Sequence, residues 1–132
     1  MKALSIRQPY ADLIASGIKT IELRNWKAPY RGPFLIHASK ILDLEACKRL
    51  KVASENLVTG AAIGKAKVID MKIYTTEKEF LKDKNKHLIR SLDNRDIRRT
   101  VGYIINNAKR FKKPVPMAGQ LYFFDVLQNA QR

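Results

Sequence analysis

The side chains best suited to chemistry lie in one short segment, residues 17–24. Lys19, Glu22 and Arg24 place two cations and a carboxylate within six positions of the chain. Apolar residues alternate with them, which is the pattern of a strand, and successive side chains of a strand point to opposite faces. The side chains expected on one face are Thr20, Glu22, Arg24 and Trp26. An acid flanked by bases suits a polar, hydrogen-bonding ligand, so we expect the main site here.

The charged residues of this segment differ in what they can hold. Arg24 is the better anion anchor, because its planar guanidinium binds a phosphate or carboxylate through two parallel hydrogen bonds. Glu22 has two interpretations: it accepts a hydrogen bond from a ligand, or it forms a structural ion pair with its neighbours. Half-buried ion pairs add little net stability, which favours the functional interpretation.

Aromatic and basic residues are interleaved directly after the segment. Trp26 and Tyr30 lie beside Lys27 and Arg31. Such a mixture is typical of a platform on which unpaired bases stack, each stack contributing ~1–3 kcal/mol. For Trp26 the alternative is an aromatic side chain that covers the core, and the sequence leaves both interpretations open.

Two further basic clusters can each be interpreted in two ways. The run 109–113 holds four cations around Phe111, and a second cluster contains Arg95, Arg98 and Arg99. The simpler interpretation is a solvated loop in both cases. The alternative is a clamp on a phosphate backbone.

The net charge of +14 is the strongest compositional feature. It arises from 26 Lys and Arg against 12 Asp and Glu, and gives a pI near 10.1. So large an imbalance produces self-repulsion in the folded state, which a polyanionic partner relieves. Nucleic acid is therefore the favoured partner. A surface whose lysines only interact with water is the alternative.

Short strands and helices must position these residues. Helices are expected after Pro9, after the N-cap residue Asp43 and at the capping box that begins with Thr76, and Gly17 suits the end of the first helix. One or two helices are expected within 82–99. The expected strands are 2–6, 20–26, 34–38, 60–75, 103–105 and 121–126. Strands outnumber helices, and the helices fall in connections, which predicts an α+β fold with a small curved sheet.

Length and composition set further expectations. A chain of 132 residues corresponds to a single domain, 1–132. No apolar run is long enough for a membrane span and no signal-peptide pattern follows Met1, so we expect a cytoplasmic protein without membrane contact. Cys47 is the only cysteine and His37 is expected to pack in the core, so neither a metal nor a cofactor is expected.

The motif Gly-x-Lys-x-x-Glu-x-Arg of residues 17–24 resembles the signature of the ASCH domain, a branch of the PUA-like superfamily. Further pieces resemble the family in the same order, over roughly 2–75 and 101–126, and 76–100 fits only as a variable insert. The matching pieces are Leu4–Ala11, Trp26, Tyr30–Gly32, Ile36–Lys40, Gly60–Asp70 and Pro116–Tyr122.

The resemblance implies a small PUA-like β-barrel with helices packed around it. It also implies binding of RNA or another single-stranded nucleic acid in one basic cleft. Cations would hold phosphates, while Gln8, Glu22 and Trp26 would read a base or nucleoside. The expected binding residues are Arg7, Gln8, Lys19, Glu22, Arg24, Trp26, Lys27, Arg31 and Lys40. The sequence contains no exposed apolar stripe that would indicate a protein partner.

The resemblance also leaves an enzymatic alternative open. Some small ASCH proteins are amidohydrolases that act on N4-acetylcytidine through a lysine, a threonine and a glutamate. Their lysine corresponds to Lys19, but their threonine falls on Glu22, and Asp70 is the nearest counterpart of their glutamate. Glu22 could still activate water beside Lys19. Binding is favoured over hydrolysis because the threonine hydroxyl is missing.

Overall fold

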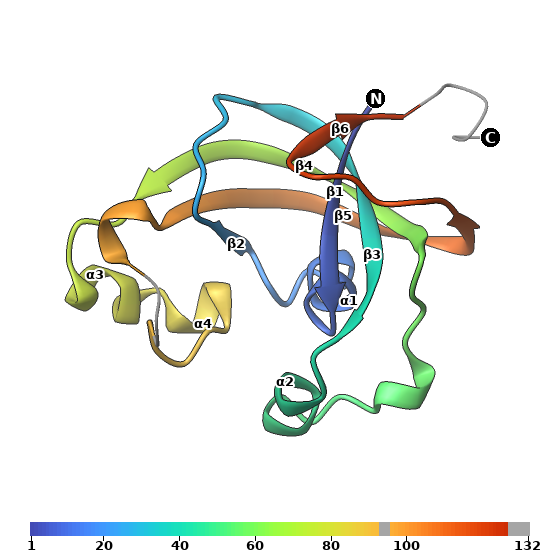
Figure 1. Cartoon of the computed structure of the whole chain (residues 1–132), viewed down its shortest axis with the longest axis horizontal. Helices are drawn as coiled ribbons and strands as arrows, with labels where there is room; N and C mark the ends of the chain where they lie inside the picture. The colour runs from blue at the N-terminus through green and yellow to red at the C-terminus, as the bar shows by residue number, and fades with distance from the viewer. Residues whose placement is uncertain (93–95, 127–132) are drawn as a thin grey trace.

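A strongly curved sheet forms the body of the computed structural model, which describes residues 1–92 and 96–126 (Figure 1). In these residues six strands follow the order β2-β5-β4-β3-β1-β6, with β1 parallel to β3 and the other neighbours antiparallel. The strands are β1 Lys2–Gln8, β2 Ile21–Arg24, β3 Gly32–Leu42, β4 Ala61–Ile73, β5 Val101–Pro116 and β6 Phe123–Asp125. The edge strands β2 and β6 are not paired with each other, so the sheet is barrel-like but open. The expected α+β class is confirmed.

Four short helices occur in connections within the described residues. They are α1 Tyr10–Ala15, α2 Leu44–Arg49, α3 Glu77–Lys82 and α4 Lys84–His87. Asp43 caps α2 by accepting from the Ala46 N–H, and Thr76 caps α3 by accepting from the Glu79 N–H, which confirms both N-cap predictions. No helix in the described part is long and apolar enough to cross a membrane.

The first helix fills the concave side of the sheet. α1 contacts β1, β3, β4 and β5, and its residues Tyr10, Ala11 and Ile14 join the main core with Phe34 and Tyr103. Gly17 ends the helical turn with φ +83°, a conformation that glycine adopts without steric cost. The chain then enters β2, which places the charged segment beside α1.

Strand β5 is much longer than the predicted strand 103–105, and the predicted loop 109–113 is wrong. Local charge suggested solvated backbone, but Lys109 and Arg110 pair with β4 instead, at Lys65 and Gly64. Tertiary pairing outweighs local composition here. A Cβ on Gly64 would lie 2.4 Å from the Lys109 carbonyl oxygen, so glycine is needed for this close approach of the two strands.

The last strand is shorter than predicted. β6 begins at Phe123 rather than near residue 121. Tyr122 has φ +60°, a left-handed conformation that interrupts an extended strand. This kink separates residues 120–122 from the strand that follows them.

The segment between β4 and β5 packs as a small layer against β2. Tyr74 and Phe80 are fully buried with Ile21 and Leu23. Asp83 accepts hydrogen bonds from the Tyr74 hydroxyl (2.7 Å) and from Lys72 (2.8 Å), and these contacts fasten α3 and α4 to the end of β4. The expected insert 76–100 is therefore an integral wall beside the charged strand.

Candidate functional site

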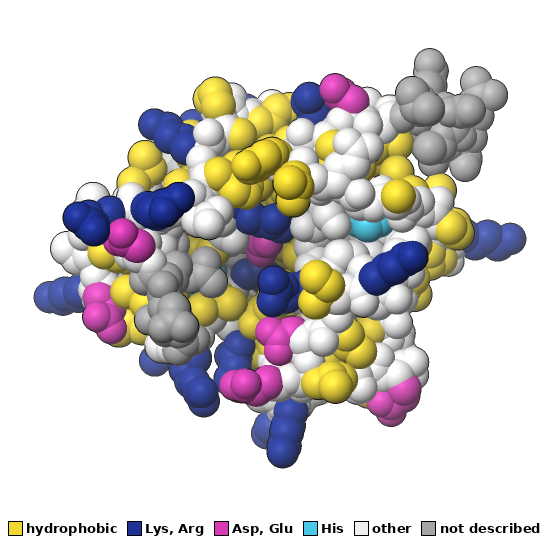
Figure 2. Space-filling model, in the orientation of Figure 1, with side chains coloured by type: hydrophobic (Ala, Val, Ile, Leu, Met, Phe, Trp, Pro, Cys, Tyr) yellow, Lys and Arg dark blue, Asp and Glu magenta, His cyan; other side chains and the backbone are white. Residues whose placement is uncertain are grey.

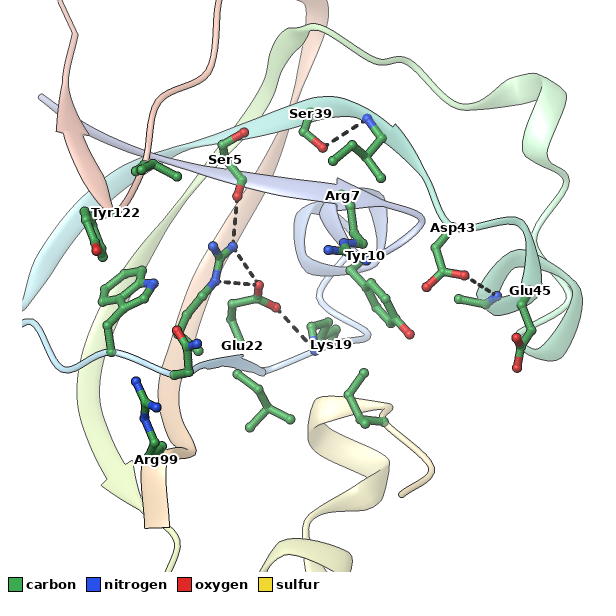
Figure 3. A pocket seen from close by; sticks show the side chains of 18 of the residues that line it. Ser5, Arg7, Tyr10, Lys19, Glu22, Ser39, Asp43, Glu45, Arg99 and Tyr122 are labelled. Atoms are coloured by element: carbon green, nitrogen blue, oxygen red, sulfur yellow. Dashed lines mark hydrogen bonds and ion pairs between the residues drawn. The ribbon is translucent and has the colours of Figure 1, made fainter. Parts of the chain in front are cut away.

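A polar cleft of about 940 Å³ opens between α1, α2, β2, the insert and residues 120–122 (Figure 3). Figure 2 shows this face hollowed at its centre, with basic and acidic side chains in the hollow and hydrophobic side chains beside it. The charged and aromatic side chains of the lining are Arg7, Tyr10, Lys19, Glu22, Arg24, Trp26, Asp43, Glu45, Arg49, Arg90, Asp96, Arg99 and Tyr122.

The floor of the cleft is a three-residue ionic network. Glu22 lies between the other two members: one carboxylate oxygen is 3.5 Å from the Lys19 ammonium, and the other accepts from Nε (3.1 Å) and Nη2 (2.9 Å) of Arg24 (Figure 3). Glu22 is 7% exposed and Lys19 only 2%. We call Lys19, Glu22 and Arg24 the floor triad. Its two cations and one carboxylate leave a formal charge of +1.

Lys19 is held by the surrounding fold as well as by Glu22. Its ammonium donates to the His87 carbonyl oxygen and lies 5.0 Å from the centre of the Tyr10 ring. His87 belongs to α4, so this hydrogen bond joins the insert to the cleft floor. Because a buried ammonium needs such partners, the insert and Lys19 stabilise each other.

Arg24 lines the cleft, and one of its donor nitrogens has no hydrogen bond within the described residues. Its Nη2 donates to the Ser5 carbonyl oxygen (2.9 Å) as well as to Glu22, and its guanidinium lies 5.8 Å from the Trp26 ring centre. Nη1 makes no hydrogen bond to any residue that the structure describes. A cleft ligand can therefore accept from an arginine whose orientation is already fixed.

The aromatic rim has one anchored ring and one exposed ring. Trp26 packs against Tyr103 (5.4 Å between ring centres), Phe123 and Tyr122, and it is half-buried beside the main core. Tyr122 is 56% exposed and Leu121 81%. Trp26 therefore covers the core, and its role in base stacking stays a prediction, while Tyr122 is the more exposed of the two rings.

Three exposed arginines surround the floor triad. Arg7 belongs to β1, whereas Arg90 and Arg99 belong to the second half of the insert 76–100. None of the three forms an ion pair with any residue in 1–92 or 96–126. Arg7 and Arg90 therefore keep their charge for an anionic ligand, while the charge of Arg99 also helps to lower the pKa of Asp96 in the same lining.

A second network connects the helices over the cleft. Arg49 of α2 donates to the Tyr10 hydroxyl (3.2 Å) and to the Leu88 carbonyl oxygen (3.0 Å). Burial raises the pKa of Tyr10, although the nearby Arg49 charge opposes the shift. Tyr10 therefore stays a neutral hydrogen-bonding group, and Arg49 fixes the wall formed by α2 and the insert.

Five of the predicted binding residues meet in this cleft, and four do not. Arg7, Lys19, Glu22, Arg24 and Trp26 line it, and Lys19 with Glu22 also forms the pair considered for catalysis. The residues outside the lining are Gln8, Lys27, Arg31 and Lys40.

Gln8 is a structural residue in this fold rather than a reader of bases. It is 1% exposed, donates to the Val58 carbonyl oxygen (2.8 Å) and accepts from the Asp12 N–H (2.9 Å). Both functions of its side-chain amide are used within the fold. The expectation that Gln8 lies in the cleft is wrong, because alternation along β1 places Gln8 on the buried face with Leu4 and Ile6, opposite the exposed Arg7.

Strand alternation explains why Lys40 lies outside the cleft. Ser39 and Ile41 line the cleft, so Lys40 between them projects away. Arg31 is exposed and bound to Asp70 (2.9 Å). Asp70 also lies outside the cleft lining, so it does not act with Lys19 as the hydrolase alternative required.

Several lining residues were not predicted from the sequence as ligand-binding residues. Tyr10, Arg49 and Arg90 belong to no recognised binding motif, and Tyr122 falls within the predicted strand 121–126. Arg99 was named only within a general basic cluster. A weak signal existed in the density of arginines in 90–99; Arg95 of that cluster lies outside the described residues.

His37 is confirmed as a packed core histidine. Its Nδ1 lies 2.9 Å from the Ser5 hydroxyl, its Nε2 lies 2.8 Å from the Met117 carbonyl oxygen, and the residue is 2% exposed. These contacts join β1 and β3 to the segment that precedes β6. Within 1–92 and 96–126 no three His, Cys, Asp or Glu side chains gather as metal ligands would.

Comparison with known proteins places this arrangement among ASCH domains. The family model of the ASCH domain matches residues 4–115. An alignment of 54 positions, which covers 36% of the chain, is 39% identical to human activating signal cointegrator 1 and spans 9% of that protein. The crystal structure of ASCH from Zymomonas mobilis matches with a TM-score of 0.72 and 12% identity, covering 98% of this chain and 90% of that one. Two single-substitution variants of it match with TM-scores of 0.69 and 0.68.

Proposed function

The chain belongs to the ASCH domain family, and on this premise we propose that it is an RNA-binding domain. The proposed ligand is a single-stranded segment that places one nucleotide in the cleft. The PUA-like fold of the family is consistent with RNA binding. The residues of the cleft support the finer proposal.

The observation that carries the proposal is the combination of a fixed donor with an exposed aromatic ring. Arg24 is oriented by Glu22 and Ser5 and keeps Nη1 for a ligand. Tyr122 lies at the rim beside Trp26 and is more than half exposed. A base stacked at the rim would direct its sugar or phosphate toward a cationic floor. This is the division of roles found in single-strand binding proteins.

The surrounding arginines supply the electrostatic part of binding. Arg7, Arg90 and Arg99 are exposed and make no ion pair with described residues. Each cation that neutralises a phosphate releases counterions, so binding weakens with salt by about 0.7 per contact on a log–log scale for single strands. These residues therefore give affinity without sequence preference.

Glu22 has a different role from the one expected of a reader. Both of its carboxylate oxygens face cations of the floor triad. It therefore acts as a positioning residue: it holds Arg24 in place and compensates the buried Lys19. The same engagement makes hydrolysis of an acylated nucleoside the weaker proposal, since a general base needs a free oxygen near the attacking water.

Binding of a labelled single-stranded 20-nucleotide RNA across a salt series tests the proposal. The variant Arg7→Gln/Arg90→Gln/Arg99→Gln should lower the magnitude of the log–log slope by about 2, from three contacts at about 0.7 each. The matched control is Lys48→Gln/Lys78→Gln/Lys82→Gln, which removes the same charge from exposed positions outside the cleft.

Equal losses in the two variants would overturn the cleft assignment, because they would show that only total charge matters. Incubation with N4-acetylcytidine tests the weaker proposal. Release of cytidine that Lys19→Ala abolishes would favour a hydrolase, and no turnover is expected.

A further inference from the structure

A second basic surface lies on β4 and β5, on the side of the sheet that faces away from α1. Lys65 and Lys67 of β4 and Lys109 of β5 are all exposed, while Ala66 and Val68 beside them are buried. We call Lys65, Lys67 and Lys109 the outer strip. None of these three lysines lines the cleft.

Strand register fixes the side on which the outer strip lies. Lys109 is directly opposite Lys65, so the two side chains share a face. Phe111, two residues further along β5, packs in a separate cluster with Ala3 and Leu35. Arg110 points the other way, where it binds Asp12 of α1 (2.9 Å). The outer strip therefore faces away from α1, whose Tyr10 lines the cleft.

The outer strip carries uncompensated charge. Directly opposite side chains of an antiparallel pair have Cβ atoms about 4.5–5.5 Å apart, where like charges are destabilising. None of the three lysines forms an ion pair with any residue in 1–92 or 96–126. The next acid along β4, Asp70, is bound to Arg31. Self-repulsion of this kind is relieved by an anionic partner.

We propose that the outer strip binds the phosphate backbone of RNA at a place separate from the cleft. Lys65 and Lys67 are two residues apart on one strand, so their side chains repeat about every 6.7 Å and form a row rather than a pocket. Lysine is a flexible point charge that contacts phosphate without selecting a base. Contact here therefore adds affinity and salt dependence without sequence preference.

The composition of the strip favours nucleic acid over other anionic partners. A protein interface is expected to contain an aromatic or arginine anchor at its centre, and the strip has neither. A membrane surface requires a broad apolar face to bury, whereas the exposed large apolar residues of β4 are Ile69 and Ile73, both beyond the lysines toward the end of the strand. A row of lysines matches a row of phosphates.

RNA length separates the outer strip from the cleft in an experiment. The variant Lys65→Gln/Lys67→Gln/Lys109→Gln is compared with wild type and with Lys48→Gln/Lys78→Gln/Lys82→Gln. The probes are a labelled single-stranded trinucleotide, short enough for the cleft alone, and a 20-base-pair RNA duplex with a three-nucleotide overhang. Trinucleotide binding should stay within twofold of wild type in both variants. For the long probe, only the outer-strip variant should lose about 2 or more from the log–log salt slope.

Thermal melting of the same variants shows whether the lysines are structural. At low salt the outer-strip variant should melt at or above the wild-type temperature, because repulsion between Lys65 and Lys109 is removed. A lower melting temperature would overturn the proposal by giving these lysines a structural role. So would an unchanged salt slope, or an equal loss in the control variant. Stronger dependence on the strip for a polyglutamate peptide or for phosphatidylserine vesicles than for RNA would assign it to protein or membrane.

Discussion

The cleft floor and the outer strip are both basic, but their charges are handled in opposite ways. In the floor triad Glu22 is bound to both Lys19 and Arg24, and all three side chains are largely buried. In the outer strip Lys65 and Lys109 are exposed and directly opposite each other. Compensated charge fixes a geometry, because each group has a defined partner. Uncompensated charge leaves geometry free and provides long-range attraction for an anion.

Removal of Glu22 should have the largest effect. Glu22→Ala leaves the buried Lys19 ammonium without its carboxylate, and breaking a buried pair in this way costs about 3–5 kcal/mol of unfolding free energy. Urea denaturation measures the loss. Glu45→Ala removes an exposed carboxylate from the same cleft and should change stability by less than about 0.5 kcal/mol. Similar small losses in both variants would contradict the structural role of the triad.

The contact between the insert and β4 should make stability sensitive to acid. Burial raises the pKa of Asp83, whereas hydrogen bonds from Lys72 and Tyr74 and the charge of Lys72 lower it. The lowering effects are larger in sum, so the pKa of Asp83 lies below its ordinary value. A carboxyl with a lowered folded-state pKa stabilises the fold above its unfolded-state pKa of about 3.9 and loses that contribution as pH falls through the folded-state pKa.

Asp83→Asn should therefore cost about 1–3 kcal/mol at pH 7 and reduce the loss of stability on acidification. Urea titrations between pH 7 and pH 2.5 measure both effects, with the exposed Asp125→Asn as control. An Asp83→Asn protein with the wild-type pH profile would show that this carboxylate does not hold the insert.

The two rim aromatics should separate binding from stability. Tyr122→Ala should weaken binding of the trinucleotide by about 1–3 kcal/mol, the contribution of one base stack, with little change in melting temperature. Trp26→Ala should lower the melting temperature as well, because Trp26 packs against Tyr103 and Phe123. If Tyr122→Ala binds like wild type, the exposed ring has no part in recognition.

A charge reversal in the outer strip should have the smallest effect and the opposite sign. Lys109→Glu replaces a like-charge pair with an opposite-charge pair across β4 and β5, which should stabilise the fold by about 0.2–1 kcal/mol. Melting at low and high salt measures the effect, and the gain should shrink with added salt. Destabilisation at low salt would mean that Lys65 and Lys109 are not in effective contact.

Local patterns predicted the parts of the molecule whose causes are local. The caps at Asp43 and Thr76 and the alternation that places Glu22 and Arg24 together depend on neighbouring residues, and all were readable in the sequence. The strand at 109–113 depends on pairing with β4, which lies more than 40 residues away in the chain. Its charged residues therefore suggested a loop.

The residues that line the cleft could be predicted only where a local cause places them. Alternation along β1 is a local cause, and it sends Gln8 into the fold while it leaves Arg7 at the cleft. Arg90 reaches the cleft because Asp83 fastens α3 to β4 and His87 contacts Lys19. No spacing of residues within the insert indicates this contact. The sequence therefore predicted the charged motif of residues 17–24 but not the wall that the insert forms beside it.

The fluorescence of Trp26 offers the most direct test that RNA occupies the cleft. Trp26 is the only tryptophan in the chain, so its emission reports on one position. A single-stranded trinucleotide is titrated at moderate salt while Trp26 emission and the anisotropy of a labelled trinucleotide are both followed. A saturable change in Trp26 emission, with the same midpoint as the anisotropy, is the result expected for a base at the rim. Saturable anisotropy with unchanged Trp26 emission would contradict the cleft as the binding site.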